Sequence, residues 1–327
     1  MTEPLTQLGW SAHWAALAAE HGPEAEPARV VRHDGVALQV RTAAGERTVK
    51  LRRGIDPITV GDWLVVDGEQ VIALLPRQSL LRRRAAGGDD QQLLAANLDL
   101  VLLVCGLDRR IVPGRIQRGA ALASDAGAEP VLVFTKRDLV DDTDLVDEVL
   151  ADVATNHPGL SHPLVTSSAT GEAIPELRSR LRSRTSVLLG ESGAGKSRLV
   201  NALLGEDVAL TGAVRASDAA GRHTTTNRQL HLLPDGGVII DSPGIREVGL
   251  AGDEESVGAA FADIDALGEE CHFSDCRHSG EPGCAIALGI EAGEISKTRV
   301  DAYLALRDEA AEGPRKLGAH DRRPQQR

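Results

Sequence analysis

Hydrophobic and polar residues alternate over short runs in the first part of the chain. From Ala28 onward these runs are ARVVRHDGVALQVRT, ERTVKL, DWLVVDG and EQVIALL, separated by turn residues such as Asp34-Gly35 and Asp67-Gly68. Alternation that is broken by turns about every eight to twelve residues is typical of a small β-barrel. We therefore expect residues 28–85 to form a barrel that ends in the basic stretch 76–84.

The pattern changes after residue 86, where wholly apolar runs alternate with helical ones. The apolar runs LDLVLLVCG, PVLVFT, LVTSSA and TSVLLG, and residues 237–241, are strand-sized, and helical segments stand between them. Apolar strands joined by helices imply a parallel sheet that is covered on both faces. The sequence thus predicts an α/β domain over residues 86–250.

Three further segments complete the predicted organisation. Residues 1–27 form an N-terminal arm with a helical patch, residues 251–312 a helical domain with a cysteine-rich loop, and residues 313–327 a basic flexible tail. No apolar run reaches the roughly 18 residues that span a bilayer, and no signal peptide is visible. We expect a cytoplasmic protein without a membrane partner.

The strongest single motif is GESGAGKS, which follows the strand TSVLL and precedes a helix. In this context the motif predicts a P-loop, whose backbone N–H groups surround phosphate oxygens at a helix N-terminus. Lys196 would neutralise the β- and γ-phosphates, and Ser197 would bind Mg²⁺. The predicted nucleotide-binding residues here are Gly190, Glu191, Ser192, Gly193, Ala194, Gly195, Lys196 and Ser197.

Two upstream motifs indicate guanine as the base. Thr135-Lys136-Arg137-Asp138 matches the [N/T]KxD pattern, in which the aspartate accepts hydrogen bonds from guanine groups that adenine lacks. The loop VTSSA contains Ser168 and Ala169 and is similar to the second guanine loop, where a backbone N–H reaches the guanine carbonyl. The chain is therefore expected to bind GTP and GDP.

Two downstream motifs resemble the switch regions of GTPases. Asp241-Ser242-Pro243-Gly244 ends a strand as the DxxG motif does, with Asp241 expected at Mg²⁺ and Gly244 at the γ-phosphate. Upstream of it lies GRHTTT, in which Thr225 is expected to close over Mg²⁺ when the γ-phosphate is present. In an ordinary GTPase the guanine motifs follow the P-loop and DxxG, but here they precede them, so the predicted domain is circularly permuted.

A cysteine-rich loop predicts a metal centre. Cys271, Cys276, His278 and Cys284 have the spacing C-x4-C-x-H-x5-C, and three thiolates with one imidazole form the closed ligand set of a structural zinc site. His272 competes with His278 as the fourth ligand, and the spacing favours His278. We expect one structural Zn²⁺ per chain.

The permuted motifs, GRHTTT, DSPG and the cysteine cluster together resemble the RsgA (YjeQ) family of small-subunit-dependent GTPases. The resemblance covers nearly the whole chain from about Ala28. It implies an OB-fold barrel, a circularly permuted GTPase domain and a C-terminal helical zinc domain. It also implies GTP hydrolysis that the small ribosomal subunit stimulates, in late maturation of that subunit. We expect the chain to act as a monomer.

Some residues bear on the hydrolysis step. Ile245 stands where many GTPases have the glutamine that orients water, and Gly193 stands where potassium-assisted GTPases have asparagine. His223, beside the switch threonines, is the nearest polar candidate for orienting water, and the resemblance favours it too. The catalytic residues are therefore predicted to be His223, Lys196 and Thr225. Thr135 replaces the usual asparagine, which is expected to loosen the support of the P-loop.

Charge is distributed unevenly along the chain. The net charge is −12, which taken alone argues against a nucleic-acid partner, but residues 28–85 carry +5 and residues 313–327 carry +4. A basic barrel and a basic tail can contact rRNA phosphates although the whole chain is acidic. The predicted rRNA-binding residues are Arg52, Arg53, Arg82, Arg83, Arg84, Arg315 and Lys316.

Other functions remain open at this point. An ATPase would lack the TKRD and SSA motifs. A permuted GTPase acting on the large subunit is a further alternative, against which the barrel and the zinc loop argue by the family resemblance alone. An rRNA-binding scaffold with only a regulatory nucleotide site would be expected to have damaged motifs, whereas Lys196, Ser197, Asp138 and Asp241 are all present.

Overall fold

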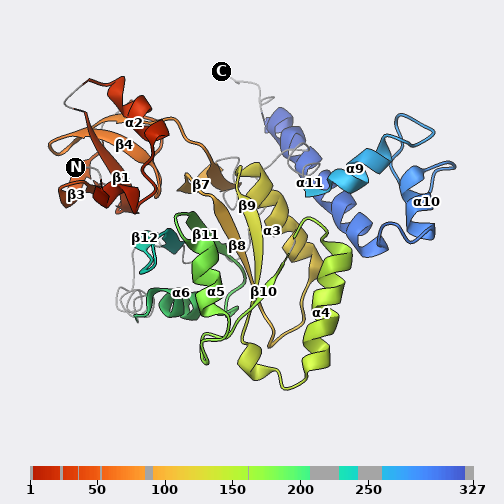
Figure 1. Cartoon of the computed structure of the whole chain (residues 1–327). Helices are drawn as coiled ribbons and strands as arrows, with labels where there is room; N and C mark the ends of the chain where they lie inside the picture. The colour runs from red at the N-terminus through yellow and green to blue at the C-terminus, as the bar shows by residue number, and fades with distance from the viewer. Residues whose placement is uncertain are drawn as a thin grey trace.

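The computed structural model of the chain describes most of the sequence. The described residues are 3–22, 25–35, 37–51, 54–84, 91–160, 162–206, 228–241 and 260–320. Within them, side chains are not described at residues 3, 83, 84, 91 and 309–320. Three regions follow one another in space, with the barrel on one side of a central sheet and the C-terminal helices on the other (Figure 1).

The N-terminal strands form a closed five-stranded barrel, as predicted. The strands are β1 (Glu26–His33), β2 (Ala37–Thr42), β3 (Gly45–Lys50), β4 (Trp63–Asp67) and β5 (Gln70–Leu74). They pair in the order β1-β2-β3-β5-β4, and β4 pairs back to β1 to close the barrel. Alternate residues of β2, such as Leu38 and Val40, are fully buried in the barrel core. This closed arrangement fits the OB-fold expectation.

The central sheet has the predicted α/β architecture. Its strands are β8 (Leu100–Gly106), β9 (Glu129–Thr135), β10 (Leu164–Val165), β11 (Thr185–Leu189), β12 (Gln229–Leu232) and β13 (Val238–Asp241). They lie in the order β10-β9-β8-β11-β13-β12, all parallel except β12, which is antiparallel to β13. Because β12 is a four-residue strand, its short QLHL pattern was not recognised as a strand in the sequence.

Two pairs of helices cover the two faces of this sheet. α3 (Pro113–Asp125) and α4 (Thr143–Asn156) pack on one face, where Leu103, Phe134 and Ile240 are buried. α5 (Ile174–Leu181) and α6 (Lys196–Leu204) pack on the other, over Leu102, Val133 and Ile239. Successive strand residues thus enter opposite cores, which explains the apolar runs of the parallel strands.

The basic stretch 76–84 does more than connect two domains. Residues Leu80–Arg84 form strand β6, which pairs with β7 (Gln91–Ala96) in a hairpin, and Leu80 N–H donates to the carbonyl of Ala126 at the end of α3 (2.9 Å). The barrel is also continuous with the central sheet, because β1 pairs with β12 at Arg32 and Gln229. The barrel and the central domain therefore share backbone hydrogen bonds.

The N-terminal arm packs where the barrel meets the central sheet. Its helices are α1 (Glu3–Thr6) and α2 (Ala12–Ala19), and Leu5 and Leu8 are fully buried. Arg29 of β1, only 1% exposed, donates to the carbonyl oxygens of Leu8 and Asn97 and to Thr185 Oγ1. One buried guanidinium thus joins the arm, the barrel and the central domain.

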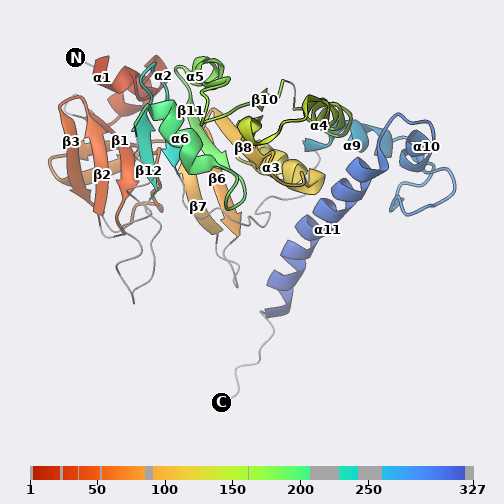
Figure 2. The same cartoon turned by 90° about the horizontal axis from the view of Figure 1, so that it is seen from below.

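The C-terminal region is helical, as expected. It contains α9 (Ala262–Gly268), α10 (Ala285–Glu291) and the long helix α11 (Lys297–His320), which projects away from the body of the molecule (Figure 2). Residues 313–320, which the sequence analysis placed in a flexible tail, continue α11. None of the described helices is long and apolar enough to cross a bilayer.

Candidate functional site

The P-loop lies between β11 and α6, at the carboxyl edge of the central sheet. Its glycines Gly190, Gly193 and Gly195 all have positive φ, at 155°, 78° and 92°. A Cβ atom at Gly190 would lie 2.3 Å from the carbonyl oxygen of Val104, so no other residue fits there. Lys196 Nζ donates to the carbonyl oxygens of Gly190 (2.5 Å) and Glu191 (2.6 Å), which places its ammonium group at the loop.

Thr135, the first residue of the TKRD motif, reaches the P-loop directly. Its side chain is buried, and Oγ1 donates to the carbonyl oxygen of Ala194 over 2.5 Å. A Cβ atom at Gly195 would lie 3.1 Å from the same Oγ1, so this glycine permits the close approach. The replacement of asparagine by threonine, expected to loosen the loop, therefore keeps a hydrogen bond to it.

The remaining guanine-type residues form one connected group. Lys136 adopts a left-handed backbone conformation (φ 63°) ahead of the short helix η1 (Arg137–Leu139), and Asp138 lies within η1. The Asp138 carboxylate accepts a hydrogen bond from Ser167 Oγ (2.5 Å). Ser167 Oγ in turn accepts from the N–H groups of Ala169 and Thr170, each at 3.2 Å. The two motifs, about 30 residues apart in sequence, meet here.

This geometry adds Ser167 to the predicted residues. From the sequence, Ser168 and Ala169 were predicted to take part in base recognition, but in the structure the Ala169 N–H group is directed to Ser167 Oγ. The hydroxyl of Ser167 connects Asp138, the predicted acceptor for guanine, with the loop that contains Ala169 and Thr170. Its position directly before Ser168 in the VTSSA motif was the signal that could have identified it.

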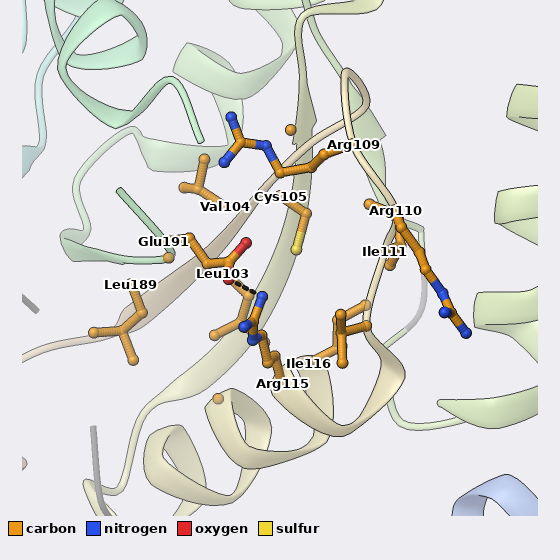
Figure 3. A pocket seen from close by; sticks show the side chains of 14 residues that line it. Leu103, Val104, Cys105, Arg109, Arg110, Ile111, Arg115, Ile116, Leu189 and Glu191 are labelled. Atoms are coloured by element: carbon orange, nitrogen blue, oxygen red, sulfur yellow. Dashed lines mark ion pairs between the residues drawn. The ribbon is translucent and has the colours of Figure 1, made fainter. Parts of the chain in front are cut away.

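The connection between β8 and α3 supplies further contacts that the sequence did not reveal. Lys136 Nζ lies 2.7 Å from the Asp108 carboxylate, and Arg109 donates to the carbonyl oxygens of Ser192 and Gly193, each at 3.1 Å. From the first turn of α3, Arg115 forms an ion pair with Glu191 of the P-loop. Figure 3 shows this pair across a small pocket, with the Cys105 thiol in its wall.

The predicted magnesium ligands lie at the same edge of the sheet. Ser197 is the second residue of α6, and Asp241 is the last residue of β13, which runs parallel to β11. Since parallel neighbours end at the same edge, the Asp241 carboxylate and the P-loop belong to one end of the sheet. His223, Thr225 and Gly244 lie outside the described residues.

The cysteine-rich loop forms a compact ligand cluster before α10. One ligand atom from each of Cys271, Cys276, His278 and Cys284 lies within 4.8 Å of all the others. His278 Nδ1 is 3.5 Å from Cys271 Sγ and 3.6 Å from Cys284 Sγ. Burial and the nearby Arg307 lower the pKa of the His278 imidazole, which favours its neutral, metal-binding form.

The structure also separates the two candidate histidines. His272 packs its ring edge-to-face against Phe273, with the ring centres 4.7 Å apart, and does not join the cluster of four. Three thiols and a neutral imidazole fit a tetrahedral zinc ion. The cluster can therefore hold a metal, with the ligand set that the spacing favoured.

Most basic side chains of the barrel segment are already engaged. Arg29 is buried, and the other six described ones form ion pairs with carboxylates: Arg32 with Asp34, Arg41 with Glu46, Arg47 with Glu26, Lys50 with Glu69, Arg77 with Asp62 and Arg82 with Asp125.

Of the predicted rRNA-binding residues, only Arg82 therefore has a described side chain, and that side chain faces α3. The side chains of Arg52, Arg53, Arg83, Arg84, Arg315 and Lys316 lie outside the described part of the chain.

The fold and the site together define a class of protein. A P-loop follows β11, and its supporting TKRD residues follow β9, which comes earlier in the chain but lies two strands away in the sheet. This is a P-loop GTPase domain with a circularly permuted order of motifs, carried between a five-stranded barrel and a helical domain with a Cys₃His cluster.

Comparison with known proteins gives the family. The family model described as RsgA GTPase matches residues 74–251. The chain is 42% identical to the small ribosomal subunit biogenesis GTPase RsgA of Streptomyces avermitilis, over 93% of this chain and 85% of that protein. It is also 42% identical to the RsgA of Xanthomonas euvesicatoria pv. vesicatoria, over 96% and 90% of the two chains. The chain belongs to the RsgA GTPase family.

Solved structures agree with this assignment. The crystal structure of YjeQ from Thermotoga maritima matches with a TM-score of 0.67 and 27% identity, over 88% of this chain and 98% of that one. YloQ, described as a circularly permuted GTPase, matches with a TM-score of 0.64 over 94% and 99% of the two chains. At 22% identity the second likeness supports the fold alone.

Proposed function

We propose that this GTPase acts in late maturation of the small ribosomal subunit and that the subunit stimulates its hydrolysis of GTP. The observation that carries the proposal is the identity of 42% with relatives named small ribosomal subunit biogenesis GTPase, over nearly the full length of both chains. All three regions of the chain, including the barrel and the cysteine cluster, fall within this likeness.

In this proposal GTP binds at the carboxyl edge of the central sheet. The P-loop residues 190–197 hold the phosphates, and Asp138 and the loop with Ser167, Ser168 and Ala169 recognise guanine. The hydrogen bonds from Thr135 to the P-loop and from Ser167 to Asp138 support this role, because they hold the two sets of groups in place before a ligand arrives.

Mg²⁺ would accompany the nucleotide, held by Ser197, Thr225 and Asp241. The ion would neutralise charge on the phosphates as the bond to the γ-phosphate breaks. We propose that His223 orients the attacking water and that contacts with the subunit place it, since Ile245 cannot hold water. A His223→Ala chain that kept its subunit-stimulated rate would exclude this role.

The Cys₃His cluster would hold one structural zinc ion. Without a vacant ligand position it would stabilise the loop between α9 and α10 rather than take part in hydrolysis. The fit of the donor set to zinc supports this assignment.

Contact with rRNA is proposed for Arg52, Arg53, Arg83, Arg84, Arg315 and Lys316. The ion pair between Arg82 and Asp125 makes Arg82 the weakest member of the predicted set. We propose that the chain acts in the cytoplasm as a monomer.

The decisive experiment measures GTP hydrolysis with and without purified small ribosomal subunits, at two salt concentrations. We expect the subunits to raise the rate and higher salt to reduce that stimulation, because phosphate contacts weaken as salt increases. Large subunits and ATP serve as the two controls. A rate that small subunits leave unchanged would refute the proposed function.

A further inference from the structure

Asp108 and Arg109 stand between the two halves of the nucleotide site. They lie in the connection from β8 to α3, and neither belongs to the P-loop or to a guanine motif. Asp108 contacts the guanine side through Lys136, and Arg109 contacts the phosphate side through the P-loop backbone. The two side chains are joined to each other by a two-pronged ion pair, with Nε–Oδ1 at 3.1 Å and Nη2–Oδ2 at 3.2 Å.

The contacts of Arg109 have a defined effect on the P-loop. Nη1 donates to the carbonyl of Ser192 and Nη2 to the carbonyl of Gly193. Because a trans peptide directs its C=O and N–H to opposite sides, holding the Ser192 carbonyl toward Arg109 directs the Gly193 N–H away from it. The absence of a side chain at Gly193 matters here, since a Cβ atom would lie 3.2 Å from Arg109 Nη2.

Asp108 provides the link to the base-recognition loop. Its carboxylate accepts from Lys136 Nζ at 2.7 Å, which holds the lysine of the TKRD motif in place. The neighbouring cations Arg109 and Lys136 lower the pKa of Asp108 to about 2. The carboxylate is thus charged at every pH at which the protein would be assayed. Gly106 makes room for it, because a Cβ atom there would lie 2.6 Å from Asp108 Oδ1.

We propose that Asp108 and Arg109 are positioning residues that couple the guanine-binding loop to the phosphate-binding loop, and so set the affinity for GDP and GTP. The proposal rests on the nucleotide site assigned above. A purely structural role is less suited to these side chains, since they keep 26% and 36% of their surface exposed and place their charged groups on the two loops of the site.

The first test compares Arg109→Ala with Arg110→Ala. Arg110 is the adjacent arginine and has no described hydrogen bond or ion pair with either loop, so its variant is the matched control. In the full-length chain, we expect Arg109→Ala to release methylanthraniloyl-GDP about tenfold faster. This factor is at the lower end of what the loss of charge-assisted hydrogen bonds produces, because the site is partly exposed. The Arg110→Ala chain should release it at the wild-type rate.

The steady-state constants separate positioning from a general loss of structure. Arg109→Ala should raise the KM for GTP about tenfold and change kcat at saturating GTP by less than about twofold, since an interaction that is equal in the ground and transition states affects binding alone. Arg109→Lys keeps the positive charge but loses the planar guanidinium that donates to two carbonyl oxygens, so it should restore part of the affinity. An unchanged KM in Arg109→Ala, or a fall in kcat with KM unchanged, would overturn the proposal.

A double-mutant cycle tests the coupling itself. If Asp108 acts through Arg109, the Asp108→Asn and Arg109→Ala effects on GDP release should combine to clearly less than their product. Effects that multiply would show two independent contacts and would overturn the coupling.

The outcome can be separated from that of the proposed function. A wild-type chain that binds GDP but ignores small subunits would refute the ribosomal role and leave this cycle intact. If the wild-type chain responds to small subunits but the effects of the two substitutions multiply, only the coupling is refuted. Thermal unfolding of each variant identifies any chain that has lost its fold, and for such a chain the Arg109→Lys result decides.

Discussion

The nucleotide site and the Cys₃His cluster hold their functional groups in different ways. The P-loop and the guanine loops extend from strands whose side chains enter two buried cores, and hydrogen bonds such as Thr135 to Ala194 join the loops directly. The cluster sits on a loop between two seven-residue helices, and most of that loop is exposed. The nucleotide site can therefore keep its shape without a ligand, whereas the cysteine loop is expected to depend on the metal ion proposed for it.

Removal of zinc should have the largest effect, and it should change the cysteine loop while leaving the nucleotide site intact. We expect a strong chelator, or His278→Ala, to unfold the loop between α9 and α10, because structural zinc contributes about 10 kcal/mol or more to such small units. Metal content should fall from one zinc per chain, while the affinity for methylanthraniloyl-GDP should change by less than about threefold, since the P-loop and the guanine loops extend from strands of the central sheet and not from the cysteine loop.

The matched control is His272→Ala, which removes the neighbouring imidazole that does not join the cluster. This variant should keep one zinc per chain by metal analysis. If His278→Ala lost GDP binding together with zinc, the nucleotide site and the cysteine loop would not be independent. The packing of Phe261 and Tyr303 into the core on the α3 face would then make the central domain and the C-terminal helices one cooperative unit.

The comparison also explains which features the sequence could predict. P-loop geometry and zinc ligation depend on residues close together in the chain, so GESGAGKS and C-x4-C-x-H-x5-C could be read directly. The pairing of β1 with β12 and the contacts of Arg109 with the P-loop join residues that are far apart in the chain. Their partners leave no local pattern.

Charged residues show the same limit. Arg82 in the sequence was indistinguishable from a surface arginine, but its guanidinium faces Asp125 at a separation of 43 residues. The N-terminal arm gave no functional signal, yet Leu8 accepts from the buried Arg29. Periodicity predicts which face is buried and does not predict what covers it.

A smaller effect is expected inside the nucleotide site. Thr135→Val removes the hydroxyl that donates to the carbonyl of Ala194 and keeps nearly the same volume. Leaving a buried acceptor without its partner costs about 1–3 kcal/mol, so we expect roughly tenfold weaker GDP binding. The measurement is the dissociation rate of methylanthraniloyl-GDP together with the melting temperature.

Ser186→Ala provides the control for Thr135→Val. Ser186 is equally buried and donates to the carbonyl of Val238 (3.0 Å), but it lies within β11, away from the loops. It should lower the melting temperature without changing GDP release. Equal effects of the two variants on GDP release would contradict the view that Thr135 acts on the P-loop.

The smallest effect concerns the junction between the two regions. At the end of α4, His157 is buried near Arg299 of α11, which itself donates to the carbonyl of Asn156 (3.0 Å) and pairs with Asp263. Burial, with the Arg299 charge adding to it, lowers the pKa of His157 to about 4 from 6.5.

The sign of the pH dependence follows from this shift. The folded state prefers neutral His157, so its contribution is fully present above pH 6.5 and is lost as the pH falls from there toward 4. At pH 5.5 the loss should be about 1 kcal/mol. The free energy of unfolding is measured with denaturant at pH 7 and pH 5.5, in excess zinc. Between these pH values His157→Gln should lose less stability than the wild type. His21→Gln, which changes an exposed histidine, should lose as much as the wild type. If His157→Gln loses as much stability as the wild type, the imidazole does not control this junction, and the acid sensitivity comes from other groups, such as His33 and His231, whose pKa values burial also lowers.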